Sequence, residues 1–509
     1  MSSGIKSVFW GSVSSQVYLI ITMLVNLAVI PFTISYLDKE QYGFALVIMQ
    51  LFGYFLILDF GLGNSLARFL SLHREQNEEN KKAINQIIST GFFIYLIIGL
   101  LVLLCGYLVS THLASGLGIH SEEGRKMIWI LTIFLAIRFP LFSVEGLLFA
   151  HQRQSLNNTI VFFSGLMNSF IIITAVYYGA GIYAFAYAFM ASSTTSFLLK
   201  YLVIRKLYPF IRISHSDFKS NMISGFYSFG FYTFLNFVGI QLILHSDKLL
   251  ISSIVSAEAV AIFTITARIP EIVMTLINKI GENSVPLLVE KTKEKYQQEF
   301  QDTFRQLLTL TTVCACISFW LIVIFNEPFV SLWVGNEFYT GNTTALLITI
   351  FYSLFSLQYF NSICLYSLGK VRNYSILTLI QASLNILLSV YLGRLYGISG
   401  VITATILSLT LSLIYIPYQT IRTLKGNFKD FVYTPVIKPL VILSPVGLGY
   451  YLLIEAYIHT ESLNWISMTG AVLTGCALLG SVAYLVFLKN ILRNLFVPRL
   501  QDLSLKNQQ

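Results

Sequence analysis

The sequence predicts an all-α polytopic membrane protein, and two observations support this fold class. Of the 509 residues, 55% are hydrophobic and only 11% are charged, whereas a soluble domain carries about 25% charged residues. Apolar segments of roughly 20 residues, each long enough to cross about 30 Å of hydrocarbon as a helix, recur from end to end. This pattern leaves no room for a soluble catalytic domain, so we expect that the protein is not an enzyme.

The apolar segments predict about fourteen transmembrane helices. The first segment follows Lys6 and is too long for a secretory signal, and no small-residue cleavage site is evident before Pro31. We therefore expect it to remain as a membrane helix. The predicted helices cover residues 10–36, 43–70, 84–109, 127–150, 157–178, 182–204, 222–254, 258–282, 304–326, 343–368, 374–396, 398–421, 434–455 and 464–488.

The basic residues predict the orientation of these helices. Both termini and every second loop together hold 26 of the 33 Lys and Arg residues, and the opposite loops hold only 4. Because loops rich in Lys and Arg stay on the cytoplasmic side, both termini are expected there. The formal net charge of +9 is therefore a signal of topology, and we expect no nucleic-acid partner.

A weak internal repeat is found when the sequence is aligned with itself at a shift of 218 residues. The matched positions are Ser35 with Ser253, Glu40 with Glu258, and Gly63 with Gly281. Six helices separate the two copies, and since six is an even number, the copies run parallel. We predict two six-helix bundles, at 1–215 and 216–425, followed at 426–509 by two additional transmembrane helices and a short cytoplasmic tail.

Two arginines at membrane depth mark a candidate substrate path, because buried charges are costly and usually face a protein interior or a water-filled cavity. Arg138 and Arg268 each lie about halfway along a predicted helix, one in each bundle, and each precedes a proline by two residues. Arginine stays ionised and offers a planar set of donors, which suits an anion such as pyrophosphate. The alternative is a static salt bridge for each arginine, with Glu145 for the first and Glu271 for the second.

Further ionisable residues are candidates for substrate binding or ion coupling. Lys248 adjoins Asp247, and their side chains point about 100° apart, so we expect one to face the path, unless both reach the outer surface. Asp59, Asp247 and Glu271 are candidates for proton or sodium coupling, because a carboxyl group in a low-dielectric site takes up protons more readily. The alternative for Asp59 is a structural pair with a basic residue such as Arg68.

Arg68 and Arg74 lie near the predicted cytoplasmic ends of the second and third helices. Basic residues at this depth meet anionic lipid head groups. Alternatively, they form a cytoplasmic entrance that recruits a negatively charged substrate.

The five cysteines all fall within apolar segments. A thiol there packs like any other small hydrophobic group. We therefore expect no disulfide, no metal site and no cofactor.

Four stretches resemble the polysaccharide-export branch of the multidrug/oligosaccharidyl-lipid/polysaccharide flippase superfamily. They are Leu37 to Gly43 (LDKEQYG), Leu58 to Ser71 (LDFGLGNSLARFLS), Asp247 to Arg268, and Ser331 to Phe338 (SLWVGNEF). The resemblance to O-antigen or repeat-unit flippases implies two bundles around a central lumen that opens alternately to the cytoplasm and the periplasm. The implied cargo is an oligosaccharide on a polyprenyl pyrophosphate, moved to the outer leaflet of the bacterial cytoplasmic (inner) membrane. Membrane lipids and other polysaccharide-assembly membrane proteins are the implied partners.

Two other functions compete with this one. An ion-coupled exporter of small organic molecules or drugs would belong to the same superfamily, but two midplane arginines disfavour a cationic cargo. A membrane polysaccharide polymerase or glycosyltransferase would need a sizeable outer loop for its catalytic groups. The longest outer loops here, 110–126 and 327–342, are too short to fold as domains.

The topology can be tested with reporter fusions. Alkaline phosphatase fused after Gln509 is expected to be inactive, because the positive-inside rule keeps the basic carboxyl terminus in the cytoplasm. The same enzyme inserted into the outer loop 327–342 serves as the control and is expected to be active. An active fusion after Gln509 would contradict the predicted orientation.

Overall fold

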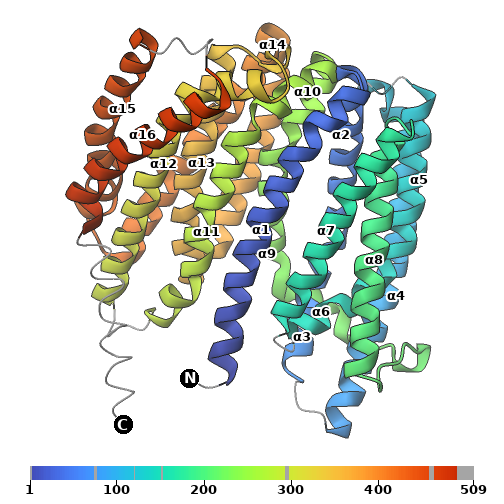
Figure 1. Cartoon of the computed structure of the whole chain (residues 1–509). Helices are drawn as coiled ribbons and strands as arrows, with labels where there is room; N and C mark the ends of the chain where they lie inside the picture. Colours follow the sequence, from blue (N-terminus) through green and yellow to red (C-terminus); the bar gives the residue numbers. More distant parts are fainter. Residues whose placement is uncertain are drawn as a thin grey trace. The chain divides into compact units, whose positions relative to one another are not determined.

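The computed structural model describes residues 3–73, 77–117, 119, 121–150, 153–292, 297–457 and 463–489. These residues are helical almost throughout (Figure 1). Within them, 11 helices are long and apolar enough to cross a membrane, or 12 if the bent pair Ala257–Thr266 and Arg268–Glu290 forms one span. The all-α polytopic membrane class is thus confirmed.

The chain forms two compact units, Met1–Ala261 and Ile262–Gln509. The first unit contains α1 (Ser3–Tyr36), α2 (Lys39–Phe55), α3 (Leu62–Ser71), α4 (Glu78–Leu108), α5 (Glu122–Arg138), α6 (Phe142–Ala150), α7 (Gln154–Tyr177), α8 (Tyr183–Leu207) and α9 (Asn221–Ile254). The second contains α11 (Arg268–Glu290), α12 (Gln297–Trp333), α13 (Asn342–Ser367), α14 (Val371–Leu424), α15 (Lys438–Tyr457) and α16 (Trp465–Ala483), while α10 (Ala257–Thr266) crosses the boundary. The division into six-helix bundles at residue 215 stays a prediction.

The number of candidate spans is lower than the predicted number of helices for two reasons. The helix α8 matches the predicted helix 182–204, but its run of Ser and Thr residues makes it less apolar than the candidate spans. The 54-residue α14 counts as one span although it contains two of the predicted helices, which meet at a break at Gly397.

Side-chain caps define several helix starts. Asp38 accepts a hydrogen bond from the Gln41 backbone N at 2.7 Å, and Asn77 accepts one from Asn80 N at 2.8 Å. Such caps satisfy backbone N–H groups that have no partner within the helix. They place the starts of α2 and α4 a few residues before the predicted boundaries.

Two predicted helices of the first unit are interrupted, which corrects the expectation of continuous helices. The predicted helix 43–70 breaks where Phe60 and Gly61 take positive φ angles of 51° and 75°, between a 3-10 turn, η1 (Leu56–Asp59), and α3. A positive φ costs little only at glycine, and one of these two residues, Gly61, is a glycine. The predicted helix 127–150 breaks at a second 3-10 turn, η4 (Phe139–Leu141), which contains Pro140.

Pro140 and Pro270, which follow Arg138 and Arg268, each leave a backbone carbonyl without its usual helical donor. For Pro270 this carbonyl belongs to Thr266, and the Asn326 side chain donates to its oxygen at 3.0 Å. The helices α10 and α11 are bent by 51° at this point. For Pro140 the carbonyl belongs to Ala136, and Gly99 packs so closely that an added Cβ would lie 2.7 Å from its oxygen.

The long helix α14 folds back on itself as a hairpin. Gly397 has a non-helical φ of 61° and ψ of −136°. Across this break Thr405 Oγ1 donates to Asn385 Oδ1 at 3.4 Å, and Ser412 Oγ donates to Gln381 Oε1. In these pairs the residue that lies farther before the break contacts the residue that lies farther after it, so the two halves run antiparallel and both ends of α14 lie on the same side of the unit.

The last two helices pack on α12 and on each other, as α15 and α16 show in Figure 1. Gly447 of α15 lies so close to Trp320 of α12 that a Cβ atom would clash with the indole ring. Tyr450 donates to the Ala471 carbonyl of α16 at 2.5 Å. In lipid, helices associate through such close packing and hydrogen bonds.

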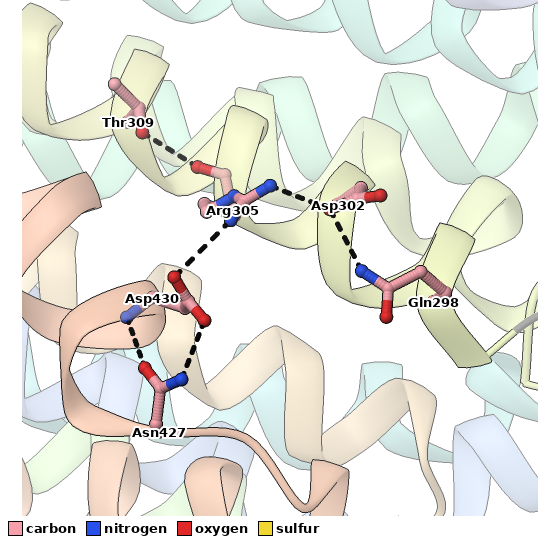
Figure 2. A network of polar contacts seen from close by, with 6 residues as sticks. All are labelled: Gln298, Asp302, Arg305, Thr309, Asn427 and Asp430. Atoms are coloured by element: carbon pink, nitrogen blue, oxygen red, sulfur yellow. Dashed lines mark hydrogen bonds and ion pairs between the residues drawn. The ribbon is translucent and has the colours of Figure 1, made fainter.

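A polar network ties the segment before α15 to α12, as Figure 2 shows. Arg305 of α12 pairs with Asp302 at 2.7 Å and with Asp430 at 3.6 Å. Asp430 belongs to η8 (Lys429–Ile437) and also accepts a hydrogen bond from Asn427 at 2.9 Å. The additional helices are therefore anchored to the second unit by both apolar and ionic contacts.

Replacing Asn326 tests how strongly the bend depends on its hydrogen bond. We expect Asn326→Ala to lower the free energy of unfolding by about 1–3 kcal/mol, because a buried carbonyl loses its donor. The measurement is the thermal melting of the purified protein. Asn342→Ala, which removes an exposed hydrogen bond to Tyr339, is the control, and equal melting of the two variants would contradict the expectation.

Candidate functional site

A charged cavity of about 580 Å³ lies within the first unit. Its polar lining comes from η1, α3, α4, α6, α7 and α8 and comprises Asp59, Asn64, Arg68, Ser71, Tyr95, Glu145, Asn157 and Lys200. The end of α3 and the start of α7, which contribute to this lining, adjoin loops that the distribution of basic residues assigns to the cytoplasmic side. This cavity is the candidate functional site.

One carboxylate in the cavity holds two cations from different helices. Glu145 Oε1 accepts a hydrogen bond from Arg138 at 3.2 Å, and Glu145 Oε2 accepts one from Lys200 at 2.9 Å. The three side chains are only 15% (Arg138), 21% (Glu145) and 10% (Lys200) exposed. The cluster therefore carries a net positive charge that is largely shielded from water.

Two members of this cluster, Arg138 and Glu145, lie on either side of the turn at Pro140. Arg138 is the last residue of α5, and Glu145 lies in the first turn of α6. The Arg138 guanidinium also lies over the Phe142 ring, 5.0 Å from its centroid, an attractive cation–π arrangement.

Asp59 lines the same cavity but has clear structural partners. Its carboxylate accepts hydrogen bonds from the Tyr95 hydroxyl and from the Gly63 backbone N, the latter at 3.2 Å. The second contact caps the start of α3, where a negative charge is favourable. Arg68, the alternative partner that we considered, is an exposed residue on the lining of the same cavity.

In the second unit, Arg268 and Glu271 form the ion pair that was the alternative to a substrate-binding role. Their side chains lie 3.4 Å apart in the first turn of α11, and they are 23% and 29% exposed. The Arg268 Nε atom is buried and has no hydrogen-bond partner among the described residues. Both arginines thus pair with the expected carboxylates, and their substrate role stays a prediction.

The remaining candidates differ in burial. Asp247 on α9 is 3% exposed, and Lys248 beside it is only half-buried. Asp247 lies close enough to Tyr54 of α2 for a Coulombic interaction. Arg74, predicted at the cytoplasmic entrance, lies outside the described residues.

The sequence analysis missed Lys200 and Tyr95, and also the uncharged lining residues Asn64, Ser71 and Asn157. Lys200 falls near the end of a predicted helix and was counted among the cytoplasmic basic residues, although it is buried against Glu145. Tyr95 is one of 29 tyrosines, and nothing in its sequence neighbourhood distinguishes it. One signal could have identified Lys200 as a buried residue. It lies inside the predicted helix 182–204, five residues before the next basic residue.

Comparisons with known proteins place the chain among polysaccharide-related membrane proteins. A family model described as "Polysaccharide biosynthesis protein" matches residues 8–291. The chain is similar to "Uncharacterized membrane protein EpsK" of Bacillus subtilis (strain 168), with 19% identity over 428 residues, which cover 83% of this chain and 84% of that protein. It is also similar to "Putative O-antigen transporter" of Shigella flexneri, with 22% identity over 372 residues, 72% of this chain and 86% of that protein.

The fold is also known from a solved structure. The structure titled "Lipid II flippase MurJ, inward closed conformation" matches with a TM-score of 0.72 and 15% sequence identity. The match covers 94% of this chain and 99% of that chain. At this identity the similarity shows the fold alone.

Removing the shared carboxylate tests the charge cluster. We expect Glu145→Gln to lower the free energy of unfolding by about 3–5 kcal/mol, because two buried cations lose their counter-charge. Thermal melting and the amount of folded protein are the measurements. Glu122→Gln breaks the exposed pair with Lys126 and is the matched control, expected to melt like the unaltered protein. A Glu145→Gln protein that also melts unchanged would show that the cluster has no structural role.

Proposed function

The chain belongs to the polysaccharide biosynthesis protein family, within the superfamily that its motifs resemble, and from this premise we propose that it is a flippase for a lipid-linked oligosaccharide. The proposed cargo is an O-antigen or related repeat unit on polyprenyl pyrophosphate. It would be moved from the cytoplasmic to the periplasmic leaflet of the bacterial inner membrane by alternating access.

The observation that carries the proposal is the cation-rich cluster on the cavity of the first unit. Arg138 and Lys200 share the single carboxylate of Glu145, so the cluster has an excess positive charge. A pyrophosphate carries several negative charges, and it would compete with Glu145 for both cations. Charge-assisted hydrogen bonds of this kind are about twice as strong as neutral ones.

The rest of the lining supports an amphipathic cargo. Asn64, Ser71 and Asn157 contribute uncharged polar groups to the cavity, and such groups pair with sugar hydroxyls. The lining also includes Ala67 and Phe142, which suit apolar surface. A cavity of about 580 Å³ accommodates a head group and leaves the polyprenyl chain in the membrane.

Arg268 in the second unit is proposed as a further anion contact at a later stage of transport. Its pairing with Glu271 mirrors that of Arg138 with Glu145, and each pair lies at a proline-associated break. In this proposal, each arginine exchanges its carboxylate partner for the anionic group of the cargo. Asp59, Asp247 and Glu271 stay candidates for ion coupling, and Lys248 stays a candidate for cargo binding.

An exporter of organic cations would need a site with an excess of negative charge. The lining of this cavity has no such excess, because Arg68 and Lys200 balance Asp59 and Glu145, and Arg138 adds a further cation bound to Glu145. Like charges repel strongly where the dielectric constant is low. We therefore favour the anionic cargo.

The proposal can be tested in proteoliposomes that contain a fluorescent polyprenyl-pyrophosphate oligosaccharide. We expect Arg138→Gln and Lys200→Met each to slow translocation at least about tenfold, which corresponds to the loss of one strong contact of about 1.4 kcal/mol. Each variant still leaves Glu145 paired with one cation, so folding is expected to be retained. Lys200→Arg should preserve part of the activity because it keeps the charge.

Lys126→Gln, which removes an exposed cation of the same unit, is the control and should transport normally. Well-folded Arg138→Gln and Lys200→Met proteins that translocate the lipid at the unaltered rate would overturn the proposal. Equal losses in the control would point to a general effect of charge removal and would also count against it.

A further inference from the structure

A second charged cavity, of about 670 Å³, lies within the second unit. It is lined by both ends of the α14 hairpin and by the turn that precedes it. Its charged lining residues are Lys370, Arg372 and Arg422. Neither the proposed transport path nor the family comparison assigns a role to this cavity.

The hairpin geometry of α14 brings these cations together. Lys370 and Arg372 lie at the start of α14, and Arg422 lies in its last turn, about fifty residues later in the chain. The break at Gly397 returns the chain to the same side of the unit, and Gly369 with a φ of 69° turns it into the helix. The three cations therefore depend on tertiary structure for their proximity.

The floor of the cavity is aromatic and ordered by packing. Tyr374 is buried together with Leu365 and Ile416, and Tyr415 packs against this cluster. Gln419 donates a hydrogen bond to the Tyr415 hydroxyl oxygen at 2.9 Å, which orients that hydroxyl. The cavity thus combines a packed floor that carries polar groups with a rim of exposed, positively charged side chains.

The charged groups that the described residues supply to the lining of this cavity are all cations. The start of α14 adds the positive end of a helix dipole.

We propose that this cavity binds a phosphate group, carried either by an anionic lipid head group or by a soluble phosphate compound. Arg372 and Arg422 would supply planar, bidentate donors for the phosphate oxygens, and Lys370 a third positive charge. Asn373, Gln419 and Thr423 offer additional polar contacts. The distribution of basic residues puts this side of the chain in the cytoplasm, where both kinds of phosphate are present.

Two binding measurements on the purified full-length protein distinguish the sources. Calorimetric titration with inorganic pyrophosphate in a neutral detergent probes a soluble phosphate. Native mass spectrometry of protein from nanodiscs of phosphatidylcholine, with or without phosphatidylglycerol, probes a lipid head group. We expect the double variant Arg372→Gln, Arg422→Gln to weaken binding of at least one probe by about tenfold or more.

Arg394→Gln is the matched control, because Arg394 is an exposed arginine of the same helix near the opposite end of the hairpin. It should bind both probes like the unaltered protein. Loss of pyrophosphate binding alone would assign a soluble phosphate, and loss of phosphatidylglycerol alone would assign a lipid. Absence of binding to both probes, or equal binding by the double variant, would overturn the proposal. Binding is measured without transport, so either result leaves the flippase proposal separately testable.

Discussion

The constraint on which this structure depends is that lipid offers no hydrogen bonds to backbone groups. A break in a membrane helix is tolerated only where protein supplies a partner or a packed neighbour. Asn326 supplies a donor at the bend before Pro270, and Gly99 covers the carbonyl that Pro140 leaves without its helical donor. Each break also forms the end of one helix and the start of the next. Arg138 and Arg268 lie at these junctions, so the same backbone feature that must be protected from lipid also positions the charges.

Buried charges inside the first unit also need partners within the protein. A buried cation is stable only with a counter-charge, and a single carboxylate, Glu145, serves two cations. This arrangement pairs both cations and leaves the cluster of Arg138, Glu145 and Lys200 with an excess of positive charge. An anionic cargo could replace part of the contribution of Glu145 without leaving any cation alone. Structural pairing and substrate binding are therefore compatible roles for Arg138, although the sequence presented them as alternatives.

The positions of most helices were predictable because the membrane demands long apolar segments, and their recurrence is a property of local sequence. The interruptions were harder to predict. A proline such as Pro140 indicates that a helix bends and Gly61 permits a positive φ, but the residue type of Phe60 does not signal its positive φ. By contrast, the break at Gly397 lies at the predicted boundary between helices 374–396 and 398–421, and the pairs Asn385–Thr405 and Gln381–Ser412 show how these two helices pack.

The sequence by itself determined the membrane class and the family resemblance, and it offered Glu145 and Glu271 as alternative partners for Arg138 and Arg268. These follow from composition, motif order and short-range spacing, as for Arg268 and Glu271 three residues apart. Only the tertiary structure decided that Lys200 joins Glu145 and that Tyr95 holds Asp59. It also decided that Lys370, Arg372 and Arg422 share one cavity. The physical reason is that these groups come from different helices, and their proximity depends on how the helices pack.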